Sequence, residues 1–256
     1  MSDVIVWGVG ELGAIFARGL LRVGCGVHPV LRDTDVAGLA ARLPEPELVL
    51  IAVGEADLDA TLRRVPAAWR DRLALLQNEL RPRDWERHGL RAPSVCIVWF
   101  EKKRGADVRV VLPSVVSGAH AKRLAESLAA LGIPCEQVEA AAALSALAAK
   151  NLYILVTNIA GLAVGGDVGA LLGTHRAFAL EVAHDVLDLE AALFAPHTFD
   201  REGALATLER AGAADPQHLC MGRSAPARLA RSLAHADALG LAVPALRRIA
   251  AQADAR

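Results

Sequence analysis

Six residues near the start of the chain have the spacing of a phosphate-binding turn. The apolar run Val4–Trp7 leads directly into this turn, and an amphipathic run follows it. The first glycine permits a tight bend, the second lets the backbone approach a pyrophosphate, and the third allows a helix to pack closely on a strand. The amides of the helix N-terminus then bind phosphate oxygens. We therefore predict a dinucleotide-binding turn at Gly8, Val9, Gly10, Glu11, Leu12 and Gly13.

The residues after the second predicted strand bear on which dinucleotide is bound. This position reaches the adenosine ribose about 20 residues beyond the glycine turn, and here it reads Leu31-Arg32-Asp33. An arginine suits the 2′-phosphate of NADP by charge and shape, whereas an aspartate binds a free 2′-hydroxyl and repels a phosphate. We favour NADP(H), with Arg32 as the phosphate ligand and Asp33 turned toward solvent. NAD(H) is the alternative.

A lysine begins the most apolar stretch of the chain. Lys150 precedes a run that ends before Asp167 and contains Asn151 and Asn158. The run is shorter than 18 residues and carries two amides, so we expect a buried helix and no membrane span. A cation beside such a run needs a partner or a water-filled cleft. Lys150 is therefore a candidate catalytic residue, and the alternative is a lysine that reaches solvent from the helix edge.

The elements that must position these residues change character along the chain. Short runs rich in Val and Ile alternate with amphipathic segments up to about Cys135, which is typical of a parallel sheet. The predicted strands are Val4–Trp7, Val27–Leu31, Leu48–Val53, Leu73–Leu76, Val95–Phe100 and Val108–Leu112, although Pro29 weakens the second. Helical periodicity then predicts helices over Glu139–Leu162, Thr174–Phe194 and Ala225–Leu239. We predict an α/β protein with a Rossmann-type dinucleotide-binding domain at 1–137 and an all-helical substrate domain at 138–256.

Charge and motif content exclude several classes. Lys plus Arg number 28 and Asp plus Glu 29, so no net field attracts nucleic acid or anionic lipid. The four cysteines form no Cys-x-x-Cys pair and no signal-peptide pattern is present, which favours the cytoplasm. The eight histidines lack the His-Glu-x-x-His spacing of a zinc site. Neither a Gly-x-Ser-x-Gly nor a Gly-x-x-x-x-Gly-Lys-Ser motif occurs, so we expect no metal, no serine hydrolase and no nucleoside triphosphatase.

These features together resemble the ketopantoate reductase family, the 2-dehydropantoate 2-reductases. The resemblance covers nearly the whole chain and is carried by the glycine turn, Arg32, the strand end Leu75-Leu76-Gln77-Asn78, the Lys150…Asn158 helix and the closing Leu239-Gly240-Leu241-Ala242-Val243-Pro244. It implies an NADPH-dependent reductase of 2-keto acids. It also implies that Asn78 lies near the nicotinamide and the substrate. Lys150 would donate a proton to the keto oxygen as hydride reaches the carbon, which agrees with the ability of an ammonium to stabilise the developing charge.

Two positions depart from the family's pattern. The family has Lys-x-x-x-Asn-x-x-x-Asn on one helical face, whereas the middle residue here is Ile154. Asn151 lies nearer the stripe of Asn158, so we expect the two asparagines to share a shifted substrate pocket. The family's glutamate, which binds a substrate hydroxyl, is replaced by Ser224. No acidic residue stands between Asp215 and Asp237, and the segment carries Arg223, Arg228 and Arg231.

The sequence therefore predicts an NADP-dependent reductase of a carbonyl compound that bears a carboxylate but lacks the family's hydroxyl. Asn158, Asn151, Ser224 and Arg223 are the candidate substrate-binding residues. The alternative from a different class is an NADP-binding sensor or partner-binding module that kept the fold and lost catalysis. A β-hydroxyacid dehydrogenase would need Lys-x-x-Asn, and Tyr153 occupies that place. We expect a small-molecule carbonyl substrate, no nucleic acid and no membrane, and the sequence is compatible with a homodimer.

Overall fold

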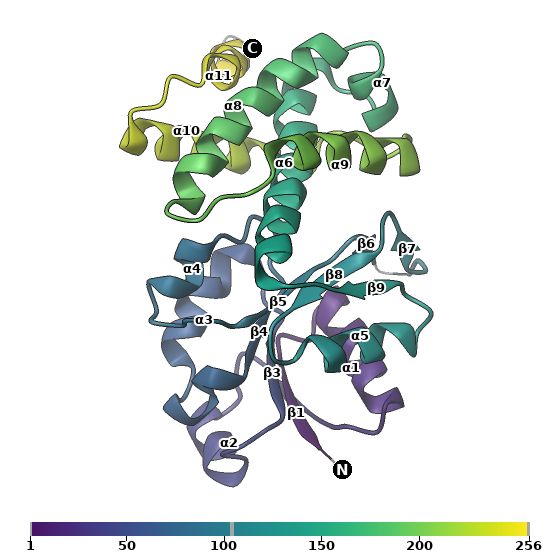
Figure 1. The fold of residues 1–256 in the computed structure, drawn as a ribbon, viewed down its shortest axis with the longest axis vertical. Helices are drawn as coiled ribbons and strands as arrows, with labels where there is room; N and C mark the ends of the chain where they lie inside the picture. Colours follow the sequence, from purple (N-terminus) through teal and green to yellow (C-terminus); the bar gives the residue numbers. More distant parts are fainter. Residues whose placement is uncertain (1, 103–104, 255–256) are drawn as a thin grey trace. The chain divides into compact units, whose positions relative to one another are not determined.

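The computed structural model describes residues 2–102 and 105–254 and divides into two compact units, Met1–Ala143 and Leu144–Arg256 (Figure 1). The sequence places the domain boundary earlier, at residue 137. The two positions differ because the strand pattern stops before the long helix α6 (Ala140–Val164), whose first turn belongs to the first unit.

The first unit is built on a seven-stranded sheet in the order β2-β1-β3-β4-β5-β8-β9. Strands β1 to β5 run parallel, whereas β8 runs antiparallel to β5 and parallel to β9. The strands are β1 Asp3–Trp7, β2 Gly26–Val30, β3 Leu48–Ile51, β4 Leu73–Leu75, β5 Ser94–Ile97, β8 Ser114–Ser117 and β9 Cys135–Gln137. The predicted α/β class, a Rossmann-type sheet followed by a helical region, is confirmed.

Helices lie on both faces of this sheet (Figure 1). On one face, α1 (Glu11–Arg22) packs against α5 (Ala121–Ala129), and a Cβ at Gly19 would lie 2.2 Å from the backbone oxygen of Ser127. On the other face lie α2 (Val36–Arg42), α3 (Leu58–Arg64) and α4 (Pro82–Glu86). The core between the sheet and the α1–α5 pair includes Val4, Val6, Phe16, Leu20, Leu124 and Leu128.

Several predicted strands differ from the observed ones. Pro29 is tolerated within β2 because β2 is an edge strand. The predicted strand Val95–Phe100 is wrong in its last part, since β5 ends at Ile97 and the chain then enters a separate two-stranded sheet. That small sheet pairs β6 (Phe100–Glu101) with β7 (Arg109–Val110), so the predicted strand Val108–Leu112 does not join the main sheet. Strands β8 and β9 were not predicted, because both are short and are held by pairing between distant segments.

The second unit is helical, as predicted. Helix α6 stops at Gly165, which has a φ of 65°, and α10 ends at Gly240, which has a φ of 68°. The helices that follow α6 are α7 (Val168–Leu172), α8 (Arg176–Phe194), α9 (Arg201–Ala214), α10 (Ala225–Leu239) and α11 (Pro244–Asp254). The bounds of α10 agree with the sequence prediction, whereas α7, α9 and α11 were not predicted.

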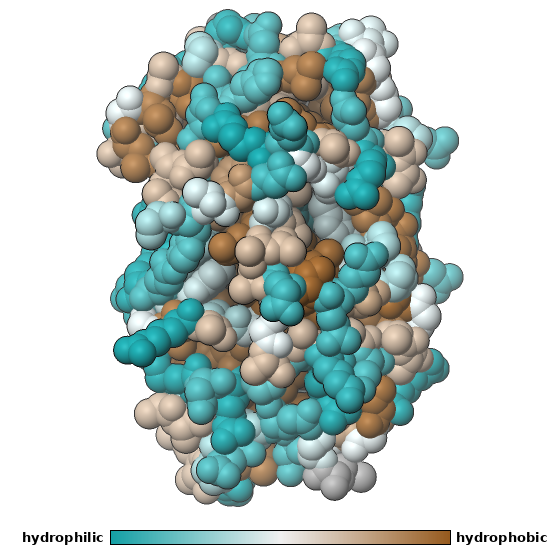
Figure 2. Space-filling model, viewed as in Figure 1, coloured by the Kyte–Doolittle hydropathy of each residue, from teal (hydrophilic) through white to brown (hydrophobic). Residues whose placement is uncertain are grey.

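Helix α6 has the length and composition of a membrane span, with 25 residues and a mean hydropathy of 1.5 over its most apolar window. The sequence-based expectation considered only the stretch after Lys150, whereas the helix that meets these two criteria begins at Ala140. However, 72% of that window is buried inside the protein, which is typical of a core helix. On the face drawn in Figure 2, hydrophilic and hydrophobic residues are interspersed, as on an ordinary folded surface.

A buried carboxylate holds the start of α11. The Oδ2 atom of Asp185, on α8, accepts hydrogen bonds from the N–H groups of Ala245 (2.7 Å) and Leu246 (3.1 Å). Burial raises the pKa of the Asp185 carboxyl, while these two bonds oppose the shift. We expect Asp185→Ala to lower the free energy of unfolding by about 2 kcal/mol, because two amides at a helix N-terminus lose their acceptor. Urea unfolding measures this loss.

Asp188 offers a matched control on the same helix. It is exposed and pairs with Arg201 at the surface. Asp188→Ala should cost about 0.5 kcal/mol or less. Equal losses in the two variants would contradict a structural role for Asp185.

Candidate functional site

The glycine turn links β1 to α1, and two of its glycines are required by the fold. Gly8 has a φ of 94°, which favours glycine, and its N–H donates to the carbonyl of Val30 (3.0 Å). A Cβ at Gly8 would lie 2.8 Å from the oxygen of Ala52, and a Cβ at Gly13 would lie 2.0 Å from the oxygen of Gly8. These contacts show the tight bend and the close helix packing that the sequence predicted for the first and third glycines.

Gly10 is not required by the fold. Its φ of −78° and ψ of −162° suit other residues, and no atom lies within 4 Å of a Cβ built there. Helix α1 begins directly after it, and its first internal hydrogen bond runs from Ala14 N–H to Gly10 O (2.9 Å). The amides of residues 11–13 therefore precede the helix's own hydrogen bonds. Because residue 10 has no side chain, the space in front of these amides is open. A phosphate group can bind in such a space at a helix N-terminus.

The other residues of the turn divide between the surface and the core. Val9 is 39% exposed and lines the cavity described below. Glu11 is exposed in the first turn of α1, while Leu12 packs against the core of the unit. The Glu11 carboxylate repels a phosphate and the Leu12 side chain faces the core, so both residues would contact a cofactor through their backbone amides.

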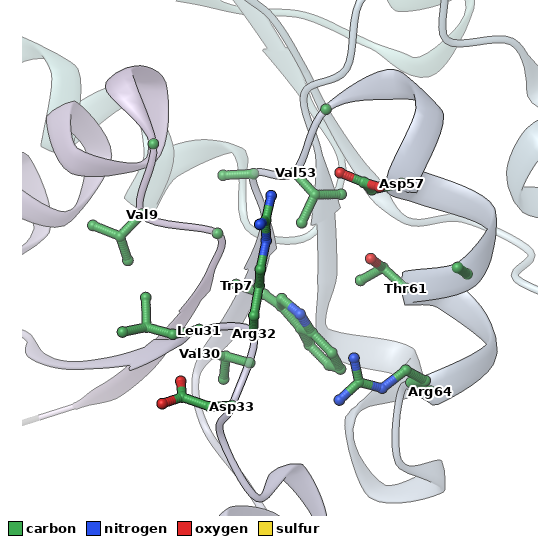
Figure 3. Close-up of a pocket in the computed structure, with 15 residues that line it drawn as sticks. Trp7, Val9, Val30, Leu31, Arg32, Asp33, Val53, Asp57, Thr61 and Arg64 are labelled. Carbon is green, nitrogen blue, oxygen red and sulfur yellow. The ribbon is translucent and has the colours of Figure 1, made fainter.

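A cavity of about 700 Å³ lies beside the turn (Figure 3). Its walls come from the turn, the carboxyl ends of β1, β2 and β3, and one side of α3, and they include Trp7, Gly10, Arg32, Val53, Thr61 and Arg64. Ligands of open parallel sheets bind at this edge, and the volume is that of an ordinary ligand pocket.

Arg32 and Asp33 both line this cavity and are exposed. In Figure 3 the Arg32 side chain extends along the cavity toward Val53, whereas the Asp33 carboxylate points away from that guanidinium. The structure thus brings Arg32 together with the glycine turn, as the sequence predicted. That Arg32 binds the 2′-phosphate while Asp33 faces solvent stays a prediction.

Asn78 is exposed and lies at the same carboxyl edge, just after β4. The neighbouring Gln77 is buried, and its amide donates to the carbonyls of Ile51 (2.6 Å) and Val53 (3.2 Å). These bonds tie the end of β4 to the end of β3 and so fix the backbone that carries Asn78. The predicted catalytic role of Asn78 remains untested.

Lys150 lies on α6 and is half-buried. Its Nζ is 5.8 Å from the centroid of the Tyr153 ring, within the range of a cation–π interaction. Ile154 is buried, so the face of α6 between Lys150 and Asn158 carries an apolar side chain at its middle position. The Lys150 amine therefore lies within cation–π range of an aromatic ring on its own helix.

Asn158, two turns further along α6, has both ends of its amide engaged. Its Nδ2 donates to the carbonyl of Ile154 (2.9 Å), and its Oδ1 accepts from Nη1 of Arg228 (2.9 Å) on α10. These bonds fix the amide's orientation and bring a guanidinium to its side. Ser224 and Arg223, predicted as substrate ligands, are both exposed at the start of α10.

Asn151 is fully buried, and its Nδ2 donates to Oε2 of Glu190 on α8 (2.9 Å). Asn158 instead contacts α10. The structure therefore pairs the two asparagines with different helices, and a substrate pocket shared by both stays a prediction.

Two further arginines contact these residues: Arg228, which the sequence analysis noted in its segment but did not choose as a site residue, and Arg64, which it did not consider. Arg228 follows Ala225 by three residues and precedes Leu229, both buried, so helical spacing places it on the inner stripe of α10. That spacing could have identified it in advance. Arg64 reaches Trp7 from another element, and no local pattern in the sequence indicates this contact.

One buried thiol and the arrangement of potential metal ligands complete the description of the second unit and the chain. Burial, with a further contribution from Asp167, raises the pKa of the Cys220 thiol to about 11, so it is protonated at neutral pH and a poor nucleophile. Within residues 2–102 and 105–254, no group of three or more His, Cys, Asp or Glu side chains could hold a metal ion.

No protein-family model and no curated protein matches the sequence, but solved structures match along the whole chain. A ketopantoate reductase from Ralstonia eutropha JMP134 is 21% identical with a TM-score of 0.66, covering 99% of this chain and 97% of its own. A dimeric ketopantoate reductase from Staphylococcus aureus is 15% identical with a TM-score of 0.66, covering 99% and 98%. D-mandelate dehydrogenase with NADH is 13% identical with a TM-score of 0.66, covering 100% and 99%. The chain therefore has the fold of the ketopantoate reductases, as the resemblance in its sequence predicted.

Proposed function

We propose that this protein is an NADPH-dependent reductase of a 2-keto acid or a similar carbonyl compound. The main observation behind the proposal is the open space at Gly10, where neither the backbone conformation nor the packing requires glycine. A pyrophosphate bound at that helix N-terminus does require glycine, because it approaches the backbone closely. The likeness to ketopantoate reductases and to D-mandelate dehydrogenase with NADH supports the same reaction class.

The cofactor would be held by residues of the first unit. The amides of residues 11–13 would bind its pyrophosphate, and Arg32 its 2′-phosphate. A bound nicotinamide dinucleotide supplies a hydride to the carbonyl carbon. Asn78, held at the carboxyl edge of the sheet by Gln77, is the proposed contact near the nicotinamide.

Lys150 would protonate the keto oxygen. A carbonyl that receives hydride develops negative charge on its oxygen, and an ammonium group both stabilises that charge and donates the proton. The Tyr153 ring attracts the ammonium group, and Lys150 is half-buried on α6. Both features favour an amine held near one position for proton donation.

The substrate would be recognised through its carboxylate. Arg228, oriented by Asn158, supplies a guanidinium suited to a carboxylate. Arg223 would add positive charge at the start of α10. Ser224 stands where the resemblance expects a glutamate, so a substrate hydroxyl would lose a carboxylate acceptor and keep at most a weaker neutral one. We therefore expect ketopantoate not to be the preferred substrate.

The remaining expectations concern partners and compartment. The Staphylococcus aureus protein of the same fold is dimeric, which supports a homodimer here. We also propose a cytoplasmic location and a small-molecule carbonyl as the substrate.

The test is NADPH consumption across a panel of 2-keto acids that includes ketopantoate and a hydroxyl-free analogue of similar size. We expect turnover with at least one hydroxyl-free keto acid. Tight NADPH binding with no consumption across the panel would instead identify a dinucleotide-binding sensor. Ile154 and Ser224 favour this alternative, because each replaces a polar residue that the resemblance expects in the active site. A preference for ketopantoate would overturn the substrate class alone.

Arg32→Gln tests the cofactor. We expect it to weaken NADPH binding by about 10- to 100-fold, because charge-assisted hydrogen bonds are worth about 1.5–3 kcal/mol, while NADH binding changes little. Calorimetric titration of both cofactors measures this. Asp33→Asn is the matched control and should not weaken NADPH binding. Tighter binding of NADH by the unaltered protein, lost in Asp33→Asn, would assign the ribose to Asp33 and the cofactor to NAD.

A further inference from the structure

A second arginine faces the cavity that carries Arg32. Arg64 is the last residue of α3, and its guanidinium carbon lies 5.7 Å from the centroid of the Trp7 ring. Figure 3 shows its side chain reaching from α3 toward that indole. Trp7 and Arg64 both belong to the cavity lining, together with Arg32.

The indole of Trp7 attracts the Arg64 guanidinium. Trp7 is the last residue of β1 and is only 4% exposed, so the surrounding core immobilises its ring. A guanidinium at this distance is attracted to the face of an aromatic ring and keeps its N–H donors available for an acceptor. The contact with Trp7 therefore favours a position of Arg64 beside the cavity.

The acidic residues of the cavity lining are not paired with this arginine in the described part of the chain. Asp59 of α3 pairs with Arg63 at 2.8 Å. Asp33 and Asp57 line the cavity, but within the part of the chain that the structure describes neither forms an ion pair with Arg64 or Arg32. Two guanidinium groups thus face one cavity.

NAD has no negatively charged group left for two arginines in this cavity. The amides of α1 would bind its pyrophosphate, and its adenosine ribose, with a free 2′-hydroxyl, carries no charge. A phosphate monoester has close to two negative charges at neutral pH and several acceptor oxygens. It can therefore satisfy two arginines at once.

We propose that Arg64, held by Trp7, is a second ligand of the adenosine 2′-phosphate and sets the preference for NADPH jointly with Arg32. This inference rests on the proposed function, since it names how that function's cofactor is distinguished from NADH. The competing role for Arg64 is structural, because an arginine in the last turn of a helix also complements the helix dipole.

The experiment compares two small probes, 2′,5′-ADP and 5′-AMP, by calorimetric titration. They differ only in the 2′-phosphate. Arg64→Gln should weaken 2′,5′-ADP binding by about tenfold, the effect of one charge-assisted contact, and leave 5′-AMP binding unchanged. Arg63→Gln is the matched control, since it removes the neighbouring charge of the same helix end but does not line the cavity. It should change neither affinity.

Each other outcome overturns the inference. Equal losses for both probes in Arg64→Gln would place Arg64 on the adenine or in the fold. An equal loss of 2′,5′-ADP affinity in Arg63→Gln and Arg64→Gln would show that the loss reflects the total positive charge near the cavity and no direct contact of Arg64. If Arg64→Gln binds 2′,5′-ADP normally while the unaltered protein still consumes NADPH, the inference fails and the proposed function stands. If the unaltered protein binds neither 2′,5′-ADP nor NADPH, both fail.

Discussion

Gly10→Val is expected to leave the protein folded and to weaken NADPH binding by about 100-fold or more. A Cβ at Gly10 meets nothing within 4 Å, so the free energy of unfolding should change by about 1 kcal/mol or less. The added side chain would occupy the space in front of the α1 amides. Loss of two charge-assisted donors at about 1.5 kcal/mol each corresponds to about 100-fold in affinity. Urea unfolding and calorimetric titration measure the two quantities.

Gly13→Ala is the control that separates binding from folding. Its Cβ would lie 2.0 Å from the oxygen of Gly8, so it should lower the free energy of unfolding by about 2 kcal/mol or more. If Gly10→Val bound NADPH as tightly as the unaltered protein, the pyrophosphate would not lie at this helix N-terminus, and the cofactor proposal would fail.

Lys150→Met is expected to lower kcat by about 100- to 10,000-fold, the usual contribution of a general acid. Methionine keeps the length and helix preference of lysine and removes the ammonium. NADPH affinity should stay within about threefold of the unaltered value, because the residues proposed to hold the cofactor belong to the first unit. Steady-state kinetics with the preferred keto acid and a cofactor titration give both numbers.

Lys122→Met is the matched control for removal of a lysine charge. Lys122 is exposed on α5 and approaches Glu126 at 4.0 Å, so its loss should leave kcat unchanged. A decrease of less than tenfold in Lys150→Met, or an equal decrease in the control, would show that Lys150 is not the proton donor.

The local features of the fold and the site were predictable from the sequence. The glycine turn could be found because its function depends on backbone shape, which glycine spacing records directly. Strands β1 and β3 were found because buried parallel strands read as continuous apolar runs. Arg32 was found because its place is counted from the turn along one strand.

Contacts between distant segments were not predictable in the same way. β8 pairs with β5 and with β9 through segments too short and too polar to stand out by themselves. The Arg228–Asn158 bond joins two helices 70 residues apart, and the Trp7–Arg64 contact joins a strand to a later helix. Ser224 and Arg223 were chosen from their place beside the family's motif, whereas the buried stripe of α10 brings Arg228 to Asn158.

The most direct measurement follows the hydride itself. The unaltered protein is incubated with a hydroxyl-free 2-keto acid and NADPH that carries deuterium at the transferable position of the nicotinamide, and the product is examined by mass spectrometry. We predict a 2-hydroxy acid with one deuterium on the carbon that was the carbonyl. NADPH bound by the protein, with no deuterated hydroxy acid formed from any keto acid tested, would contradict the proposed reductase.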